Sequence, residues 1–234
     1  LPHNLHESAA LACFFAGKHV LLEKPMAHSL ESAERILQAS QKVTTTFMIA
    51  EQAQYWTDVI KARELMDAGA IGEVISASGN FYDRVVIDPD APPPWRYSLA
   101  ISGGGVTMDG GAHWIRPLRM MMGEVDEVIG VAGRHVPRME SESWSRMLMK
   151  FENGTVGVLT CQNVMHASGP TDMFRITGSE GELQITGGRD GQLLLFNKEH
   201  PRGEVIMSTV EGKRNSYGEE IKDFCKVVLD GATM

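Results

Sequence analysis

The N-terminal part of the chain alternates between helix and strand patterns, and this alternation constrains the fold more than any other feature. Apolar residues recur at helical spacing over residues 5–16 and 30–42, and Ser29 suits the N-cap of the second helix. Short apolar or β-branched runs at 18–23 and 45–50 predict buried strands after each helix. The order helix, strand, helix, strand is typical of a parallel α/β layer, which we therefore expect.

The remainder of the chain predicts a different architecture. Helices are expected over 57–68, 106–122 and 216–230, and strands over 73–82, 125–134, 144–151, 156–164, 172–177, 182–186, 192–197 and 204–210. We expect an α/β domain at residues 1–53 and, at residues 54–234, an α+β domain built on a large, mainly antiparallel sheet.

Composition restricts the partners and the compartment. The formal net charge of −8, with scattered Lys and Arg, argues against a nucleic-acid partner. No apolar run approaches the roughly 18–20 residues of a membrane span, and no signal peptide is recognisable, so no membrane partner is expected. Cys13, Cys161 and Cys225 lack CxxC spacing, which indicates reduced thiols and a cytoplasmic protein. The chain opens on Leu1 rather than Met, and we expect it to be a fragment of a longer protein.

The strand at 18–23 leads directly into Lys24 and Pro25. In open α/β sheets, ligands bind outside the carboxyl ends of the strands, so Lys24 is a candidate for chemistry. Pro25 would end the strand and fix the following turn. A surface lysine beside a turn proline is the alternative interpretation.

A glycine-rich segment at 103–113 supplies the second candidate group. Asp109 and His113 are four residues apart, so on one helix they would share a face, where the carboxylate can orient the imidazole for acid–base chemistry. A structural Asp–His pair near a flexible turn is the alternative. Met108 stands where a G-x-G-x-x-G motif needs its third glycine, so no phosphate loop is predicted here. No third metal ligand stands out in the sequence, so no metal is predicted.

Taken together, these segments resemble the Gfo/Idh/MocA oxidoreductase family. The resemblance rests on Gly-Lys-His-Val-Leu-Leu-Glu-Lys-Pro at 17–25, followed later by Trp-Arg, Gly-Gly-Gly and Asp-x-x-x-His, and it extends over essentially the whole chain. Residues 2–6 resemble the family's Pro-Asn-x-x-His turn, and residues 64–74 resemble the start of its second domain. The resemblance implies that residues 1–53 are the C-terminal portion of a dinucleotide-binding Rossmann domain whose glycine-rich pyrophosphate loop would precede Leu1. Residues 54–234 would then be a substrate-binding and oligomerisation domain.

The resemblance implies an NAD(P)-dependent dehydrogenase or reductase, which transfers a hydride between the nicotinamide and a sugar, a polyol or a similar secondary alcohol or its ketone. The implied catalytic residues are Lys24, Asp109 and His113, where Lys24 stabilises alkoxide charge, His113 or Lys24 takes the hydroxyl proton, and Asp109 orients the imidazole. The residues implied to contact NAD or NADP are Pro2, His6, Glu23, Lys24 and Pro25, and those implied to contact the small-molecule substrate are Tyr82, Arg84, Trp95 and Arg96. A homodimer or homotetramer through the sheet face is also implied.

The chain departs from the family pattern at two places. Arg116 stands where the family often has an acid, and Gln52-Ala53-Gln54 stands where many members have Asn-x-Arg. These departures keep open a non-catalytic ligand-binding or scaffold protein with the same fold. Metal-assisted hydrolysis at Asp109 and His113 is a weaker alternative.

Overall fold

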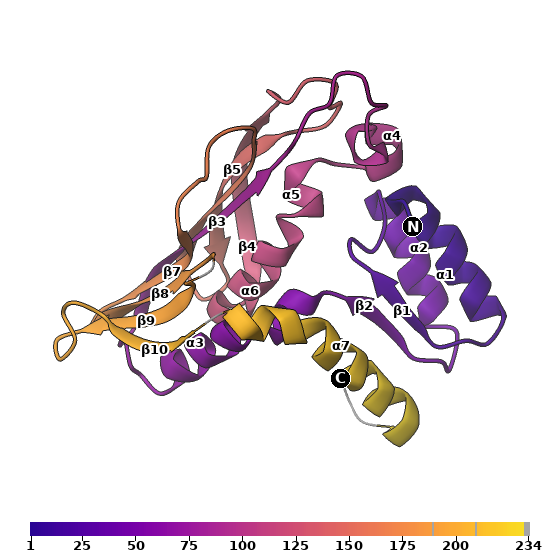
Figure 1. The fold of residues 1–234 in the computed structure, drawn as a ribbon. Coiled ribbons are helices and arrows are strands. Elements are labelled where there is room, and N and C mark those ends of the chain that lie inside the picture. Colours follow the sequence, from indigo (N-terminus) through magenta and orange to yellow (C-terminus); the bar gives the residue numbers. More distant parts are fainter. Residues whose placement is uncertain (189, 209, 232–234) are drawn as a thin grey trace.

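The computed structural model describes residues 1–188, 190–208 and 210–231. Its N-terminal part is a small α/β layer, drawn in indigo and violet in Figure 1. Strands β1 (Val20–Glu23) and β2 (Phe47–Ala50) pair in parallel, and the short η1 helix (His3–Leu5) leads into α1 (His6–Phe15), which packs on α2 (Leu30–Ser40). The order of elements predicted for this part is confirmed.

The side chains of the N-terminal part explain why it folds in this way. The Ser29 hydroxyl caps α2 by accepting a hydrogen bond from the Ser32 backbone N–H at 3.2 Å, as predicted. Phe14 of α1, Ile36 of α2 and Leu22 of β1 belong to one buried apolar cluster between the helices and the strands. The exclusion of these side chains from water holds the layer together.

The second part of the molecule is built on an eight-stranded sheet with the order β10-β9-β8-β7-β3-β6-β5-β4. The strands are β3 (Val74–Arg84), β4 (Val125–Gly133), β5 (Trp144–Phe151), β6 (Val156–Val164), β7 (Asp172–Gly178), β8 (Gly181–Thr186), β9 (Gln192–Asn197) and β10 (Glu204–Ser208). Neighbouring strands are antiparallel, except that β3 and β6 run parallel. The predicted large, mainly antiparallel sheet is therefore confirmed.

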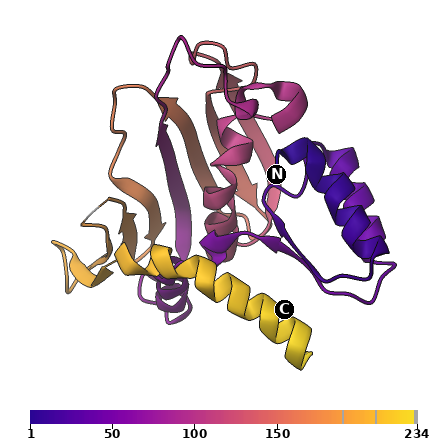
Figure 2. The same ribbon diagram turned by 45° about the vertical axis from the view of Figure 1, so that its right-hand side comes forward.

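Helices cover one face of this sheet and leave the other face open (Figures 1 and 2). The covering helices are α3 (Thr57–Asp67), α5 (Val106–Asp109) and α6 (Ala112–Met122). Phe151, Leu159 and Phe174 are fully buried in the core of this part. The short helices η3 (Trp95–Tyr97) and α4 (Leu99–Ser102) lie in the segment that connects β3 to α5.

Two predicted elements differ from the structure. The single helix expected over 106–122 is two helices, α5 and α6, separated at Gly110 and Gly111. A Cβ on Gly110 would lie 2.0 Å from a ring carbon of Phe81, so the glycine lets the chain approach β3 closely. The last helix was expected to start at 216, but α7 spans Val210–Asp230 and residue 209, at the end of the predicted strand, lies outside the described residues. Asn215, a residue of low helix propensity, precedes the expected start, and packing against other elements stabilises the helix.

Helix α7 connects the two parts of the molecule. It runs from the sheet towards the N-terminal layer (Figure 2) and contacts α3 and η2 (Gln52–Tyr55), the short helix that follows β2. The predicted domain boundary between residues 53 and 54 falls inside η2 and stays a prediction. None of the helices in the described ranges is long and apolar enough to cross a membrane.

Candidate active site

Lys24 lies directly after β1, at the carboxyl end of the small parallel sheet. Its Nζ donates hydrogen bonds to the backbone oxygen of Asp109 at 2.6 Å and to Asp109 Oδ1 at 3.1 Å. The Lys24–Pro25 peptide bond is cis. Two segments 85 residues apart in sequence therefore meet through one ammonium group at the junction of the two parts.

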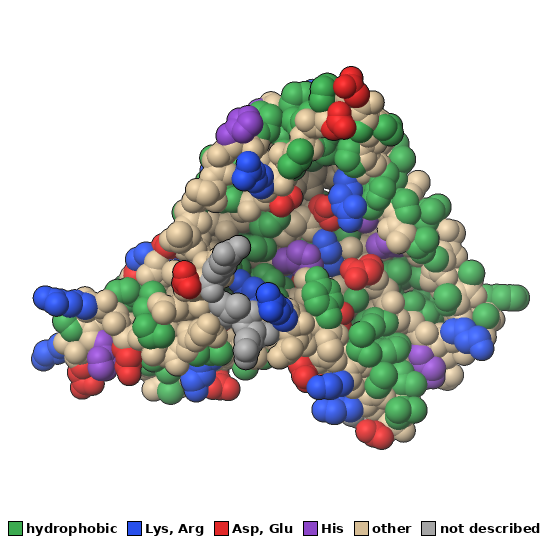
Figure 3. Space-filling view, in the orientation of Figure 1, with side chains coloured by type: hydrophobic (Ala, Val, Ile, Leu, Met, Phe, Trp, Pro, Cys, Tyr) green, Lys and Arg blue, Asp and Glu red, His purple; other side chains and the backbone are tan. Residues whose placement is uncertain are grey.

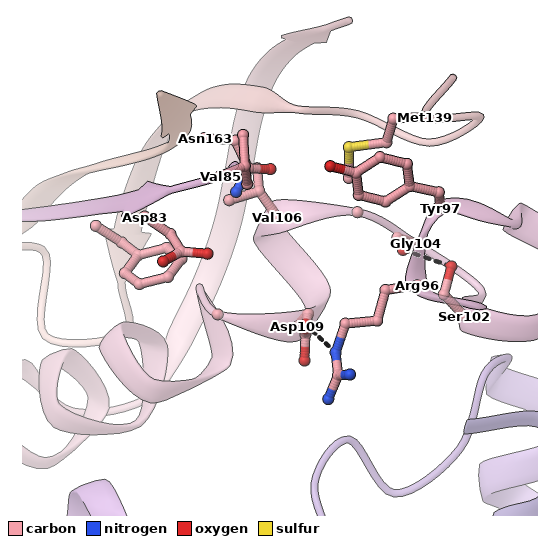
Figure 4. Close-up of a pocket in the computed structure, with 13 residues that line it drawn as sticks. Asp83, Val85, Arg96, Tyr97, Ser102, Gly104, Val106, Asp109, Met139 and Asn163 are labelled. Carbon is pink, nitrogen blue, oxygen red and sulfur yellow. Dashed lines mark hydrogen bonds and ion pairs between the residues drawn. The ribbon is translucent and has the colours of Figure 1, made fainter. Parts of the chain in front are cut away.

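Asp109, the last residue of α5, also binds a second cation. Arg96 Nε donates a hydrogen bond to Asp109 Oδ2 at 2.8 Å (Figure 4), and His3 Nε2 lies 4.0 Å from Oδ1. Burial would raise the pKa of Asp109, but Lys24 and Arg96 outweigh burial and lower it below its usual value. Asp109 is therefore an ionised group that neutralises the cations around it.

His113, in the first turn of α6, has a different carboxylate partner from the one expected. Its Nδ1 lies 2.6 Å from Glu51 Oε1, which also accepts a hydrogen bond from the Ala53 backbone N–H at 3.0 Å. The expected orientation of His113 by Asp109 is wrong, because the turn at Gly110 and Gly111 separates the two residues onto different helices. Glu51 fixes the imidazole instead, and Nε2 is left as the nitrogen that can exchange a proton with a ligand.

A cavity of about 110 Å³ lies beside Asp109 in the second part of the molecule (Figure 4). Phe81 and Asp83 of β3, Arg96 and Tyr97 of η3, and Asn163 of β6 are among its lining residues. Burial, together with the nearby Asp109 carboxylate, raises the pKa of Asp83. The apolar rings and the polar groups of the cavity suit a small molecule that carries hydroxyl groups.

The residues predicted for the substrate divide into two pairs. Trp95 and Arg96 lie at the junction, where the Trp95 ring contacts the His3 ring edge-on at 4.8 Å and the Arg96 guanidinium lies 4.4 Å from the Trp95 ring. Tyr82 and Arg84 are not among the residues that line the cavity. They alternate with Phe81 and Asp83 along β3, so they project from its other face. Substrate contact by all four residues stays a prediction.

The residues predicted for the cofactor gather around the end of β1. His6 Nδ1 lies 2.9 Å from the Pro25 carbonyl oxygen, and the Pro2 carbonyl accepts a hydrogen bond from the Leu5 N–H at 3.0 Å. Figure 3 shows a hollow between the two parts, where charged and histidine side chains gather. The carboxylate of Glu23 and the ammonium of Lys24 are groups that bind hydroxyls and amides, so this set fits the nicotinamide and ribose end of a dinucleotide.

The sequence interpretation missed Glu51, Asp83 and Asn163. Glu51 directly follows β2, so the rule that singled out Lys24 at the end of β1 also points to it. Asp83 and Asn163 carry no comparable signal, since only the pairing of β3 with β6 places them opposite each other. No group of three or more His, Cys, Asp or Glu residues within 1–188, 190–208 and 210–231 is arranged to hold a metal ion.

Comparison with known proteins gives matches along both parts of the chain. The model of the oxidoreductase family with an NAD-binding Rossmann fold matches residues 1–51, and the GFO/IDH/MocA C-terminal domain matches residues 59–184. Levoglucosan dehydrogenase of Pseudarthrobacter phenanthrenivorans is 25% identical over all of this chain and 70% of its own length. Myo-inositol 2-dehydrogenase of Thermotoga maritima is 27% identical over 97% of this chain and 67% of its own length.

Solved structures agree with these matches. An oxidoreductase of Thermotoga maritima superposes on the whole chain with a TM-score of 0.81 at 28% identity, and the chain covers 67% of that structure. Levoglucosan dehydrogenase in complex with NADH and L-sorbose has the same fold, with a TM-score of 0.87 at 24% identity over all of this chain and 70% of that structure. The matched relatives are named dehydrogenases and reductases, and the predicted fold class, a Rossmann portion followed by a domain with a large sheet, is confirmed. The chain belongs to the GFO/IDH/MocA family of NAD-binding oxidoreductases.

Proposed function

We propose that the complete protein oxidises a secondary alcohol of a sugar or polyol, or reduces the corresponding ketone, with NAD or NADP. The observation that carries this proposal is the pair of Lys24 and Asp109, which joins the Rossmann portion to a cavity that suits a hydroxylated molecule. Relatives named for levoglucosan, myo-inositol and D-xylose support the substrate class.

Each polar group at the junction has a role in this reaction. The nicotinamide, when bound, accepts or supplies the hydride. The Lys24 ammonium stabilises the negative charge that develops on the substrate oxygen. His113 exchanges the hydroxyl proton through Nε2, while Glu51 holds Nδ1 and so fixes which nitrogen faces the substrate. Asp109 binds Lys24 and Arg96 and sets the position of both cations.

The test is a turnover assay with the complete protein across a panel of sugars and polyols, followed by nicotinamide absorbance. Lys24→Ala is expected to abolish the turnover of any active substrate. Lys61→Ala is the matched control, because Lys61 pairs only with Glu64 on the exposed side of α3 among the described residues. Equal turnover by Lys24→Ala and the wild type would refute the assignment of Lys24. Tight cofactor binding without turnover of any compound would favour the scaffold alternative.

The two departures from the family pattern contact each other. Arg116 Nη2 donates a hydrogen bond to Gln54 Oε1 at 2.9 Å. Arg116 and Gln54 are thus hydrogen-bonded to each other, and neither is a partner in the hydrogen bonds of Lys24 with Asp109 or of His113 with Glu51. The two departures therefore leave the contacts of Lys24 and His113 intact, as the enzyme requires.

We also propose that two copies pair through the open face of the large sheet. Ile129 and Val131 of β4 are 74% and 62% exposed, and Leu148 and Val158 beside them on the same face are also exposed. An apolar patch of this kind typically marks a protein–protein contact. Light scattering should give a dimer or tetramer for the wild type and a smaller species for Ile129→Lys.

The free cysteines of the chain support a cytoplasmic location.

A further inference from the structure

Helix α7 brings a buried acid to the junction of the two parts. Glu220 is only 4% exposed, and its Oε1 has no hydrogen-bond partner among the described residues. On the same helix, the Tyr217 hydroxyl accepts a hydrogen bond from Gln52 Nε2 at 3.2 Å, and Asp223 accepts one from the Tyr55 hydroxyl at 2.7 Å. Residues three apart share a helix face, so these two contacts hold Glu220 against η2.

The charged groups that act on Glu220 are carboxylates. Burial first, and then the carboxylates of Glu23 and Glu51, raise the pKa of Glu220 to about 7, with no cation in the described part of the chain opposing them. Burial raises the pKa of Tyr55 and of Tyr217 as well, so both hydroxyls stay neutral. Glu220 is thus the acid of this group that gains a proton near neutral pH.

Two basic side chains of α6 lie next to the residues that surround Glu220. Arg116 donates to Gln54 and acts on Tyr55, while His113 Nδ1 lies 2.6 Å from Glu51 Oε1. Glu51 is therefore hydrogen-bonded to His113 and electrostatically coupled to Glu220. A charge that appears on Glu220 acts on the same carboxylate that orients the imidazole.

We propose that Glu220 is a positioning residue that acts through Glu51 on His113: as a neutral acid it leaves Glu51 ionised and bonded to the imidazole, and on ionising it adds a negative charge behind that pair. The step is the loss of one proton from Glu220 to solvent. The inference rests on the proposed function for the catalytic role of His113, but the coupling itself does not depend on turnover. An added negative charge favours the protonated imidazole, so Glu220 links the state of His113 to pH near 7.

The test compares Glu220→Gln with Glu219→Gln in the complete protein. Gln keeps the size of the side chain and removes its ionisation, while Glu219 is the matched control because it lies on the exposed side of α7, paired with Lys222. In the wild type, carboxyl ¹³C NMR should show Glu220 titrating near 7, and the ring ¹⁵N resonances of His113 should respond to that step. Glu220→Gln should abolish the response of His113, and Glu219→Gln should keep it.

The pH profile of kcat/KM for alcohol oxidation gives a second measurement. Its acid limb should lie about half a pH unit lower in Glu220→Gln, because the negative charge that favours the protonated imidazole is then missing. A Glu220 that titrates in the usual carboxyl range, or a His113 response that persists in Glu220→Gln, would overturn the inference. Since the NMR titrations need no substrate, a lack of turnover rejects the proposed function and leaves the coupling to be judged by NMR.

Discussion

Replacement of Glu51 gives the most direct test of the site. Glu51 Oε1 accepts two hydrogen bonds, from His113 Nδ1 at 2.6 Å and from the Ala53 N–H at 3.0 Å. In Glu51→Gln the amide oxygen can occupy the same place and accept both bonds, so the geometry is kept and only the charge is lost. In Glu51→Ala both donors lose their partner.

The magnitudes follow from these contacts. A hydrogen bond to a charged group contributes about 1.5–3 kcal/mol and a neutral one about 0.5–1.5 kcal/mol, so Glu51→Gln should cost about 1.4 kcal/mol. Each 1.36 kcal/mol is a factor of ten in rate, so kcat should fall about tenfold in Glu51→Gln and at least about a hundredfold in Glu51→Ala. KM should change little, because Glu51 acts on the histidine rather than on the substrate.

The assay is steady-state nicotinamide absorbance on the substrate found in the panel. Glu124→Gln is the control, since Glu124 pairs with Arg119 on the surface and its loss should leave kcat unchanged. The reasoning fails if Glu51→Gln is as active as the wild type, or if it raises KM while kcat stays the same. Either result would mean that the Glu51–His113 bond does not position the group that exchanges the proton.

Three further predictions concern stability. Gly103→Ala places a Cβ 1.8 Å from a backbone oxygen of the N-terminal part at φ +78°, so in urea unfolding it should lose more stability than the matched control Gly69→Ala, which has φ +77° and open space around it. The pKa of Asp109 is lowered in the folded state, so its ion pairs stabilise the protein above the usual carboxyl range and are lost as the pH falls. Arg96→Ala should therefore move the acid-unfolding midpoint to higher pH, whereas an unchanged midpoint would contradict the pairing. The pKa of Glu220 is raised to about 7, so wild-type stability should fall as the pH rises from 5 to 8, by up to about 3 kcal/mol relative to Glu220→Gln, as measured by urea unfolding at each pH.

Elements that depend on local chemistry could be predicted from the sequence. The periodicity of residues 5–16 and 30–42 and the cap at Ser29 need only neighbouring residues, and the structure confirms them. The strands of the large sheet were likewise found from their alternation. The family resemblance then supplied the arrangement of the two parts, which local patterns do not contain.

The pairing of side chains across the molecule could not be predicted in the same way. His113 lies 62 residues from Glu51, and Lys24 lies 85 residues from Asp109, so these contacts depend on tertiary packing. No local sequence pattern predicts the parallel pairing of β3 with β6 either, because the two strands are far apart in the sequence. A spacing of four residues predicts a shared helix face only while the helix is continuous, and the turn at Gly110 removes that condition.

Two carboxylates divide the chemistry of the junction between them. Asp109 binds the cations Lys24 and Arg96, and Glu51 binds His113. If a single carboxylate bound both His113 and Lys24, protonation of the histidine would weaken the ion pair between that carboxylate and the lysine. Both cations would then share one negative charge. With two carboxylates, proton exchange at His113 leaves the Lys24–Asp109 pair unchanged. Substitutions of Arg96 should therefore alter KM and kcat without moving the pH profile of kcat/KM, whereas substitutions of Glu51 should move it. Equal pH shifts in both sets of variants would show that the two pairs act as one unit.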